Sequence, residues 1–581
     1  MSVNDKLSIW QQNVNKSPTC QHDLVSNNEL ALMKIDILAL QEPAINAFNC
    51  SVASKDWTPV YPTAHKDAPS KTRSLLLVRS QVSTDTWNQI DFPSSDVTVI
   101  QLNGNWGKLT LFNIYNNGNN NKTILLLTKF HHENRTLLGQ EEGNAHIIWL
   151  GDFNRHHPHW DDPNDTRLFT GEAVKNAEAL IEAVAEVGLD LALPSGIPTH
   201  LHNVTKKWSR LDQVFLSDHS ENLLIACDTQ TEHRGINTDH LPIRTELNLK
   251  VSTIEEEPAP NFRKVDWDEF GKALEERLEA LQPVVQISTQ RQLDLSCKEL
   301  TIAIQEVIHE QVPKARITPK TKRWWTKELM QLQRQAGRLG RQAYKRRGEP
   351  QHPIHGEHKE AAKRYDKTLQ FTKKQHWCDW LERAEEPDIW TVQRMISAPA
   401  TDGGKARIPI LKRKTGEQET AASTNKEKSA MLAQGFFPPK PQDDRIQQGY
   451  KYPRQQQVRS KITREQIRSQ LRRIKPYKAP GPDGIPNIVL TKNAQLLTDR
   501  LLLIYEAMFE RQLLYKPWKN FTTVVLRKPG KPRYDVPKAY RPIALLNTMW
   551  KVLTAIVAEQ LTHITEKYQL LPANHFGGRP G

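Results

Sequence analysis

The segment HIIWLGDFN, residues 146–154, ends an apolar run on two polar side chains that could do chemistry, Asp152 and Asn154. Side chains alternate along a β-strand, so both would lie on one face at the carboxyl end of this strand. Sites often form at such sheet edges in α/β proteins. A turn in which both side chains bond backbone groups explains the pattern equally well. The segment therefore indicates a function only together with others.

Polar residues also end or interrupt other apolar runs of the first 250 residues. They are Asn13 and Asn15 after LSIWQQ, Glu42 after DILALQ, Tyr115 after LTLFNI, Asp212 within WSRLDQVF, and Asp239 and His240 before LPI. Each alone has an ordinary explanation, such as a strand-end cap, a surface charge or a histidine in a loop. Six such interruptions are hard to explain separately, so we expect them to form one site.

The apolar runs that carry these residues have the length of strands. We expect strands at 7–14, 35–42, 74–80, 97–103, 108–115 and 146–153, and a helix at 172–187, where apolar residues recur at helical spacing. Many strands with few helices favour stacked sheets with helices outside them.

The motifs resemble, in wording and order, those of the endonuclease/exonuclease/phosphatase family, and more narrowly the apurinic-like endonuclease domain of non-LTR retrotransposons. The matching segments are QQNVN, LALQEP, NIY, GDFNRHH, GIPTH, WSRLD and TDHLP, which cover about residues 5–248. Thr238 departs from the family, which more often has serine there, but it keeps the hydroxyl group. The resemblance implies an α/β fold with a four-layer α/β/β/α sandwich over residues 1–250.

The resemblance also implies a metal cofactor, Mg²⁺, with Mn²⁺ as an alternative. Glu42 would be the principal ligand, helped by Asp239 and Asn15. Hydrolysis of a phosphodiester brings a nucleophile to an anionic phosphorus, so hard oxygen ligands that hold a neutralising cation suit the chemistry.

The resemblance gives the remaining residues their expected roles. His240, oriented by Asp212, would handle the proton of the attacking water or contact the phosphate, and Asp152 competes for the role of general base. Hydrogen-bond donors to the phosphate would be Asn13, Asn154 and Tyr115. Thr199 and Ser209 would support the residues of the site without contacting the substrate.

Charge divides the chain into two parts. Residues 1–250 contain 21 Lys+Arg and 29 Asp+Glu, a net of −8, so the remaining 59 and 37 give residues 251–581 a net of +22. A basic second part suits a polyanion, for which nucleic acid is the obvious candidate. We expect a linker at 251–262, a mostly helical basic connector at 263–455, and a further region at 456–581.

The connector contains two predicted helices. In residues 265–281, Asp266 is the expected N-cap. In residues 322–347, Arg334, Arg338, Arg341 and Lys345 form one stripe, and small or apolar residues form another on the opposite side. The basic stripe is either a solvated face or a nucleic-acid-binding face that follows phosphates.

The third region resembles the opening of a non-LTR reverse transcriptase. KPYKAPGPDGIPNIVL and RKPGKPRYDVPKAYRPIALLN carry the resemblance, and Lys528 and Arg541 match positions that face the template or the incoming triphosphate. The palm carboxylates of that family lie further downstream, and no aspartate follows Lys551. We therefore expect no polymerase activity from this chain and loose packing at 456–581.

These observations predict an Mg²⁺-dependent DNA endonuclease that nicks target DNA and leaves a 3′-hydroxyl to prime reverse transcription. Its expected partners are double-stranded target DNA and element RNA, with the oligomeric state left open. Two alternatives remain, an abasic-site repair endonuclease and a non-catalytic remnant that binds nucleic acid. Without a signal peptide or a run of about 18–20 apolar residues, we expect a soluble protein of the nucleus or cytoplasm, without membrane contact.

Overall fold

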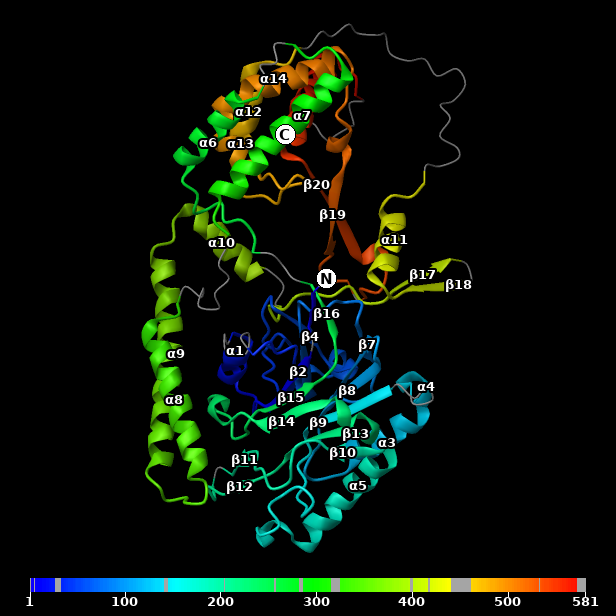
Figure 1. Cartoon of the computed structure of the whole chain (residues 1–581), viewed down its shortest axis with the longest axis vertical. Coiled ribbons are helices and arrows are strands. Elements are labelled where there is room, and N and C mark those ends of the chain that lie inside the picture. Colours follow the sequence, from blue (N-terminus) through cyan, green and yellow to red (C-terminus); the bar gives the residue numbers. More distant parts are fainter. Residues whose placement is uncertain are drawn as a thin grey trace. The chain divides into compact units, whose positions relative to one another are not determined.

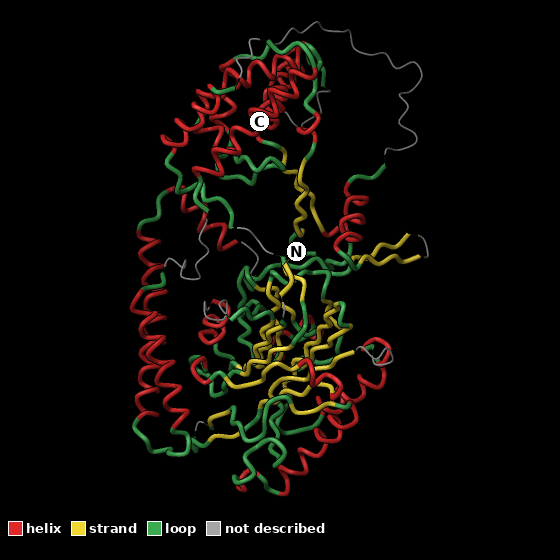
Figure 2. Tube along the Cα trace, viewed as in Figure 1, coloured by secondary structure: helices red, strands yellow, loops and turns green. Residues whose placement is uncertain are grey.

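The computed structural model describes residues 2–4, 6–26, 33–139, 145–202, 204–254, 258–281, 286–314, 324–397, 401–415, 418–439, 461–531 and 533–571 (Figures 1 and 2). Contacts divide the chain into two units. The first comprises Met1–Glu256, Ile317–Pro409 and Ser423–Asn425, and the second comprises Glu257–Arg316, Ile410–Ala422 and Lys426–Gly581. Residues of the predicted connector thus contribute to both units.

Two six-stranded sheets form the centre of the first unit. One sheet has the order β10 (Leu189–Leu191), β13 (Asp212–Ser217), β9 (Ala145–Asp152), β8 (Gly107–Tyr115), β7 (Val97–Gly104), β6 (Trp87–Ile90). The other has the order β14 (Leu224–Thr229), β15 (Ile243–Leu247), β2 (Leu7–Asn13), β3 (Ile37–Gln41), β5 (Ser74–Arg79), β4 (Trp57–Val60). Short pairs join β1 (Ser2–Asn4) to β16 (Val251–Thr253) and β11 (His200–Leu201) to β12 (Trp208–Ser209). All six predicted strands are confirmed.

The strands of both sheets are apolar on both faces. Each sheet is therefore covered on both sides, by the other sheet on one side and by helices on the other. Side chains such as Ile9, Ile148 and Val214 fill the core between the sheets. The outer face of the β9 sheet packs against α3 (Lys122–Glu133) and α5 (Gly171–Val187), and that of the β2 sheet against α1 (Pro18–Ser26). The four-layer α/β/β/α sandwich is thereby confirmed.

The predicted helix at 172–187 is α5, and its ends follow from its sequence. The Thr170 hydroxyl accepts a hydrogen bond from the Ala173 N–H at the start, and Gly188, with φ of 71°, ends the helix. The short α4 (Arg135–Leu138) ends at Gly139 in the same left-handed conformation.

A helical hairpin from the predicted connector belongs to the first unit. Its helices are α8 (Lys327–Lys345) and α9 (Ile354–Glu382), which lie side by side (Figure 1) and are followed by α10 (Glu386–Ser397). The Thr326 hydroxyl caps α8, and the predicted apolar stripe is buried at Leu329, Leu332, Ala336 and Ala343.

The second unit is mainly helical. Its elements are α6 (Trp267–Glu279), α7 (Gln290–Gln311), β17 (Leu411–Thr415), β18 (Gln418–Ala422), α11 (Asn425–Phe436, with Asn425 in the first unit), α12 (Arg464–Arg473), α13 (Asn487–Lys492), α14 (Ala494–Glu510), β19 (Phe521–Arg527), β20 (Tyr540–Leu546) and α15 (Thr548–Lys567). Asp266 caps α6, as predicted.

The expectation of loose packing at 456–581 is wrong for the helices of this region. Apolar residues of α12, α13, α14 and α15 share one buried core with α6 and α7, in which Tyr505 and Trp518 are enclosed. The expectation fits the β19–β20 hairpin, where Val524, Leu526 and Ile543 are exposed. The predicted loop at 436–460 lies mostly outside the described residues.

Within the described ranges, no helix has the length and apolar character that a membrane span requires. Among the described residues, none of the five cysteines forms a disulfide.

Candidate active site at the rim of the two sheets

Strand direction brings the predicted site residues to one rim of the sandwich. β2 runs parallel to β3, and β8 runs parallel to β9, so the carboxyl ends within each pair meet at one edge. Asn13 ends β2, Tyr115 ends β8 and Asp152 ends β9, while Glu42 directly follows β3. In the antiparallel β13, the first residue, Asp212, is paired with Asp152.

Gly151 is the glycine of GDFN, and its position has no room for a side chain. Its φ is 149°, and an added Cβ atom would lie 1.8 Å from the carbonyl oxygen of Ile114 in β8. Any other residue would push β8 and β9 apart, because that oxygen belongs to the backbone of the neighbouring strand. The glycine therefore lets Asp152 reach the rim in register with Tyr115.

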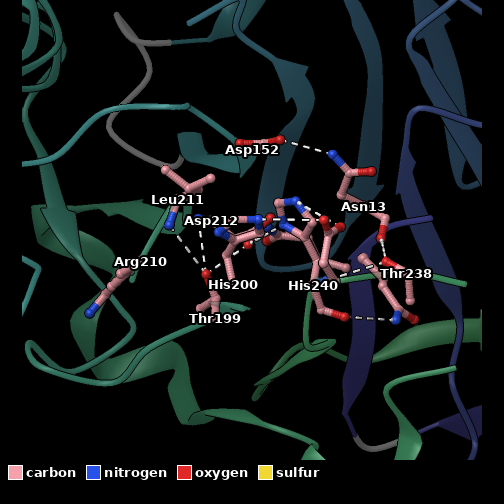
Figure 3. Close-up of polar contacts among 12 residues, drawn as sticks. Asn13, Asp152, Thr199, His200, Arg210, Leu211, Asp212, Thr238 and His240 are labelled. Atoms are coloured by element: carbon pink, nitrogen blue, oxygen red, sulfur yellow. Dashed lines mark hydrogen bonds and ion pairs between the residues drawn. The ribbon is translucent and has the colours of Figure 1, made fainter. Parts of the chain in front are cut away.

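Asn13 and Asp152 join the two sheets (Figure 3). The Asn13 Nδ2 group donates a 2.8 Å hydrogen bond to Asp152 Oδ2, and the Asn154 N–H donates to Asp152 Oδ1. Burial, together with the negative charges of Asp212 and Glu42, raises the pKa of Asp152 to about 7, although His240 and Asn13 oppose the shift. A carboxyl group with such a pKa can take up and release a proton near neutral pH.

His240 and Asp212 form a second buried pair. His240 Nδ1 lies 2.8 Å from Asp212 Oδ2, and the Thr199 hydroxyl donates to the same oxygen at 2.7 Å. Burial disfavours the charged imidazole, but the Asp212 carboxylate outweighs burial and raises the pKa of His240 to about 9. The second nitrogen, Nε2, has Asp239 as its nearest acid at 3.9 Å. His240 is thus a buried cation whose Nε2 remains available to a ligand.

Glu42 and Tyr115 lie beside this cluster. Burial, the charges of Glu42 and Asp152, and a hydrogen bond to Glu42 raise the pKa of Tyr115 to about 12, so its hydroxyl stays protonated. The Arg73 guanidinium stacks on the tyrosine ring at 4.6 Å. Glu42 has a φ of 45°, and its carboxylate is 18% exposed.

Asn15, Asn154 and Ser209 lie around the rim without joining the buried pairs by their side chains. Asn15 is exposed with a φ of 46°, and its N–H donates to Asn13 Oδ1. The Asn154 amide donates to the carbonyl oxygen of Asn116, and Ser209 contacts His200 at 3.3 Å.

His200 is a residue that the sequence reasoning missed, although it ends the quoted motif GIPTH. Its Nε2 lies 3.6 Å from Asp239 Oδ2, and its ring lies 4.7 Å from that of His240. Burial raises the pKa of Asp239, but the hydrogen bond from His200 and the charge of His240 lower it to about 2. The Asp239 carboxylate therefore remains ionised at neutral pH.

Arg210 was also missed, and its hydrogen bonds stabilise the segments next to the rim. It is buried, and its guanidinium donates to the carbonyl oxygens of Leu193 and Pro194 and to Gln213. Its N–H donates to Asp161 Oδ1. The only signal in the sequence was its place in the quoted segment WSRLD.

The predicted nucleic-acid-binding residues lie away from these buried pairs in the chain. Arg334, Arg338, Arg341 and Lys345 are exposed on α8, where Arg341 Nε pairs with Glu232 Oε2 at 2.8 Å. In the second unit, Lys528 donates to the Lys538 carbonyl oxygen, and Arg541 is exposed on β20.

The rim residues fit a divalent cation by their chemistry. Glu42, Asp239 and Asn15 offer hard oxygen donors, as Mg²⁺ prefers, and the two carboxylates keep part of their surface accessible. One potential ligand atom from each of Asp152, Asp212 and His240 also lies within 4.8 Å of the others.

The first unit thus contains a four-layer α/β/β/α sandwich with a polar rim, the fold that the sequence motifs predicted. Residues 109–244 match the family described as "Endonuclease-reverse transcriptase". The chain is 24% identical over 452 residues, 74% of its length, to the probable RNA-directed DNA polymerase from transposon BS of Drosophila melanogaster, of which it covers 46%. It is 22% identical over 570 residues to the RNA-directed DNA polymerase from mobile element jockey of Drosophila funebris, covering 95% of this chain and 58% of that protein.

These matches confirm the resemblance to proteins of non-LTR retrotransposons: residues 109–244 match an endonuclease-reverse transcriptase family model, and the chain is similar in sequence to RNA-directed DNA polymerases of mobile elements. It spans about half the length of the curated relatives it matches. Among solved structures, the endonuclease domain of TRAS1, a telomere-specific non-LTR retrotransposon, matches with 15% identity and a TM-score of 0.33, covering 42% of this chain and 99% of that one. The AP endonuclease LMAP from Leishmania major matches with 14% identity and a TM-score of 0.34, covering 42% and 88%.

Proposed function

We propose that the first unit is a metal-dependent DNA endonuclease that hydrolyses one phosphodiester bond of target DNA and leaves a 3′-hydroxyl to prime reverse transcription. The observation that carries this proposal is the pair of buried contacts at the rim, Asn13 with Asp152 and His240 with Asp212. Both contacts lie at one rim, and they support the proposal because hydrolysis of a phosphodiester needs a proton acceptor and a stabilised negative charge on the phosphate.

Asp152 is the general base in this proposal. Its pKa of about 7 lets it accept the proton of the attacking water at neutral pH, while Asn13 and the Asn154 N–H hold the carboxylate in place. The sequence left two candidates for the general base, His240 and Asp152, and this proposal assigns the role to Asp152.

His240 contacts the phosphate instead. Asp212 accepts from Nδ1 and keeps the ring charged, so Nε2 donates to a phosphate oxygen as negative charge builds there. The protonated Tyr115 hydroxyl and the Asn154 amide are further donors at the same rim. Thr199 holds Asp212, and through it the orientation of His240.

Glu42, Asp239 and Asn15 would hold Mg²⁺, with Mn²⁺ as the substitute. When bound, the cation neutralises charge on the phosphate. The low pKa of Asp239 supports this role, because a metal ligand must be deprotonated.

The test is nicking of supercoiled plasmid by the full chain, with Mg²⁺ or with EDTA, for the wild type and for Asp152→Asn. We expect the wild type to nick only with the metal and the variant to lose about 10²–10⁴-fold in rate. Nicking by the variant at the wild-type rate would refute the assignment of Asp152.

The same substrates separate the alternatives. A strong preference for an abasic duplex over the intact one would favour a repair endonuclease. Salt-dependent binding of DNA without metal-dependent cleavage, by a chain shown to be folded, would favour a binding remnant.

A further inference from the structure

A second site in the first unit is an arginine-lined pocket of about 620 Å³ between the α8–α9 hairpin and the loop before His240. Arg234 lines it from the loop, and Arg334, Arg338 and Arg341 line it from α8. Arg334, Arg338 and Arg341 were predicted to share one stripe of α8, whereas Arg234 opposite them was not predicted.

The walls of the pocket are held together by specific packing. Ile236 of the loop is buried in a core with Leu329 and Leu332 of α8 and with Tyr365 and Leu369 of α9. In this arrangement the hairpin is packed against the endonuclease domain.

A glycine explains how closely α8 approaches the loop. A Cβ atom at Gly337 would lie 2.9 Å from the carbonyl oxygen of Glu232. Glycine is unfavourable within a helix relative to alanine, so its presence here is explained by this close approach.

The acids of the pocket have partners, whereas two of its arginines have none among the described residues. Glu232 pairs with Arg341, and Asp23 accepts a 2.9 Å hydrogen bond from the Tyr365 hydroxyl. Arg334 and Arg338 have no ion pair or hydrogen bond with any residue that the structure describes. The pocket therefore has an excess of positive charge that its own carboxylates do not neutralise.

Arg234 is the best-placed cation of the pocket. Its Nε donates to the carbonyl oxygen of Thr238 at 3.1 Å, and its guanidinium lies 5.7 Å from the centre of the Trp208 ring. Within the described part of the chain, its two Nη groups have no acceptor. The Nε hydrogen bond fixes the guanidinium and leaves a planar pair of Nη donors, which suits a phosphate.

The pocket and the rim share one loop. Gln12 Nε2 donates to the carbonyl oxygens of both Arg234 and His240, at 2.5 and 3.3 Å. The Thr238 hydroxyl donates to the carbonyl oxygen of Asn13. A polyanion that occupies the pocket therefore lies beside the proposed cleavage site, along the same stretch of backbone.

We infer that this pocket binds a backbone phosphate of the target DNA duplex, flanking the bond that the rim hydrolyses; the inference rests on the proposed function for its choice of DNA. The connector hairpin thereby supplies part of the DNA-binding surface of the endonuclease. Arg234 and the two unpaired arginines of α8 are the phosphate ligands, and Arg341 holds α8 against the loop through Glu232.

The test measures equilibrium binding of a fluorescent blunt DNA duplex to the full chain in EDTA, over a series of salt concentrations. The variant Arg334→Gln with Arg338→Gln should lose about 10- to 100-fold in affinity and lower the salt slope by about 2. The matched control is Lys363→Gln with Lys367→Gln, which removes two exposed charges from α9 outside the pocket. Arg334→Lys with Arg338→Lys should retain the salt slope.

Equal affinity and equal salt slope for the pocket variant and the control would overturn the inference. So would a loss that appears with single-stranded RNA but not with the duplex, because the ligand would then be RNA. Because binding in EDTA needs no catalysis, plasmid nicking measured in parallel tests the nuclease separately. If the wild type binds DNA through the pocket but does not nick it, the proposed endonuclease function is refuted and the inference about the pocket stands.

Discussion

The rim of the two sheets and the arginine pocket lie along the same loop, yet they are built in opposite ways. At the rim, the charged groups His240 and Asp212 are buried and paired with each other. In the pocket, Arg334 and Arg338 are exposed and without an ionic partner among the described residues. Paired, buried groups hold a fixed geometry, whereas unpaired cations keep their charge available for a ligand.

This difference predicts separate kinetic effects. Changes at the rim should lower the rate of cleavage with little effect on DNA binding, and changes in the pocket should weaken binding with little effect on the rate at saturation.

His240→Gln should have the largest effect. Removing the charged donor should lower the nicking rate at saturating plasmid by about 10²–10³-fold, because a neutral amide cannot replace a cation facing the phosphate. DNA affinity in EDTA should stay within about threefold of the wild type by the same argument. A comparable loss of DNA affinity would break the separation between rim and pocket.

Glu42→Gln should raise the Mg²⁺ concentration that gives half-maximal nicking by about 10- to 100-fold. The substitution keeps the volume and removes the charge that would bind the cation. Titration of Mg²⁺ at fixed plasmid measures the effect, with Arg338→Gln as the control from the pocket. An unchanged metal requirement in the rim variant would remove Glu42 from the metal site.

Gly337→Leu should force α8 away from the loop, because the added side chain meets the Glu232 carbonyl oxygen. We expect a loss of about 1–3 kcal/mol in the free energy of unfolding, and the weakened DNA binding of the pocket variant. The control is Gly348→Leu, since a Cβ atom at Gly348 has no heavy atom within 4 Å. Denaturant unfolding and DNA binding that are the same for both variants would contradict the close packing of the hairpin.

A second buried histidine, His131, has no carboxylate partner in the part of the chain that the structure describes, and it shows what burial alone does. Burial lowers its pKa to about 3, while Trp149 Nε1 donates to its Nε2 at 3.1 Å. The folded state therefore resists protonation below the unfolded value of 6.5, and stability falls as the pH drops below that value. The loss attributable to His131 should be about 1.4 kcal/mol at pH 5.5.

Denaturant unfolding at pH 7.5 and at pH 5.5 measures this smallest effect. His131→Gln keeps an acceptor for Trp149 but does not titrate, so it should lose less stability than the wild type between the two pH values. Equal losses in both proteins would show that His131 takes up its proton while folded.

Much of the fold was predictable from local sequence. The runs LSIWQQN, LTLFNIY and HIIWLGD are apolar enough to be buried strands whatever surrounds them, and they are β2, β8 and β9. The amphipathic stripe of α8 was predictable for the same reason, since its period of apolar residues needs no knowledge of the partner. The packing of residues 461–571 was not, because α14 and α15 bury their faces against α6 and α7, more than 180 residues earlier in the chain.

The sequence predicted which residues form the site, but not which of them contact one another. Polar residues at the ends of apolar strands are visible in the sequence, so Asn13, Glu42 and Asp152 could be chosen one by one. His200 and Arg210 were missed because neither ends an apolar run, and only the fold brings them beside Asp239 and Asp161.

The sequence by itself therefore determined which residue types this protein offers for the proposed phosphodiester chemistry and on which local elements they lie, because strand and helix periods are local properties. Tertiary structure alone decided the partners. It joined Asn13 to Asp152 across 139 residues and set Arg234 opposite α8. Those contacts depend on how two sheets and a hairpin pack, and packing is set by long-range burial, which no local pattern encodes.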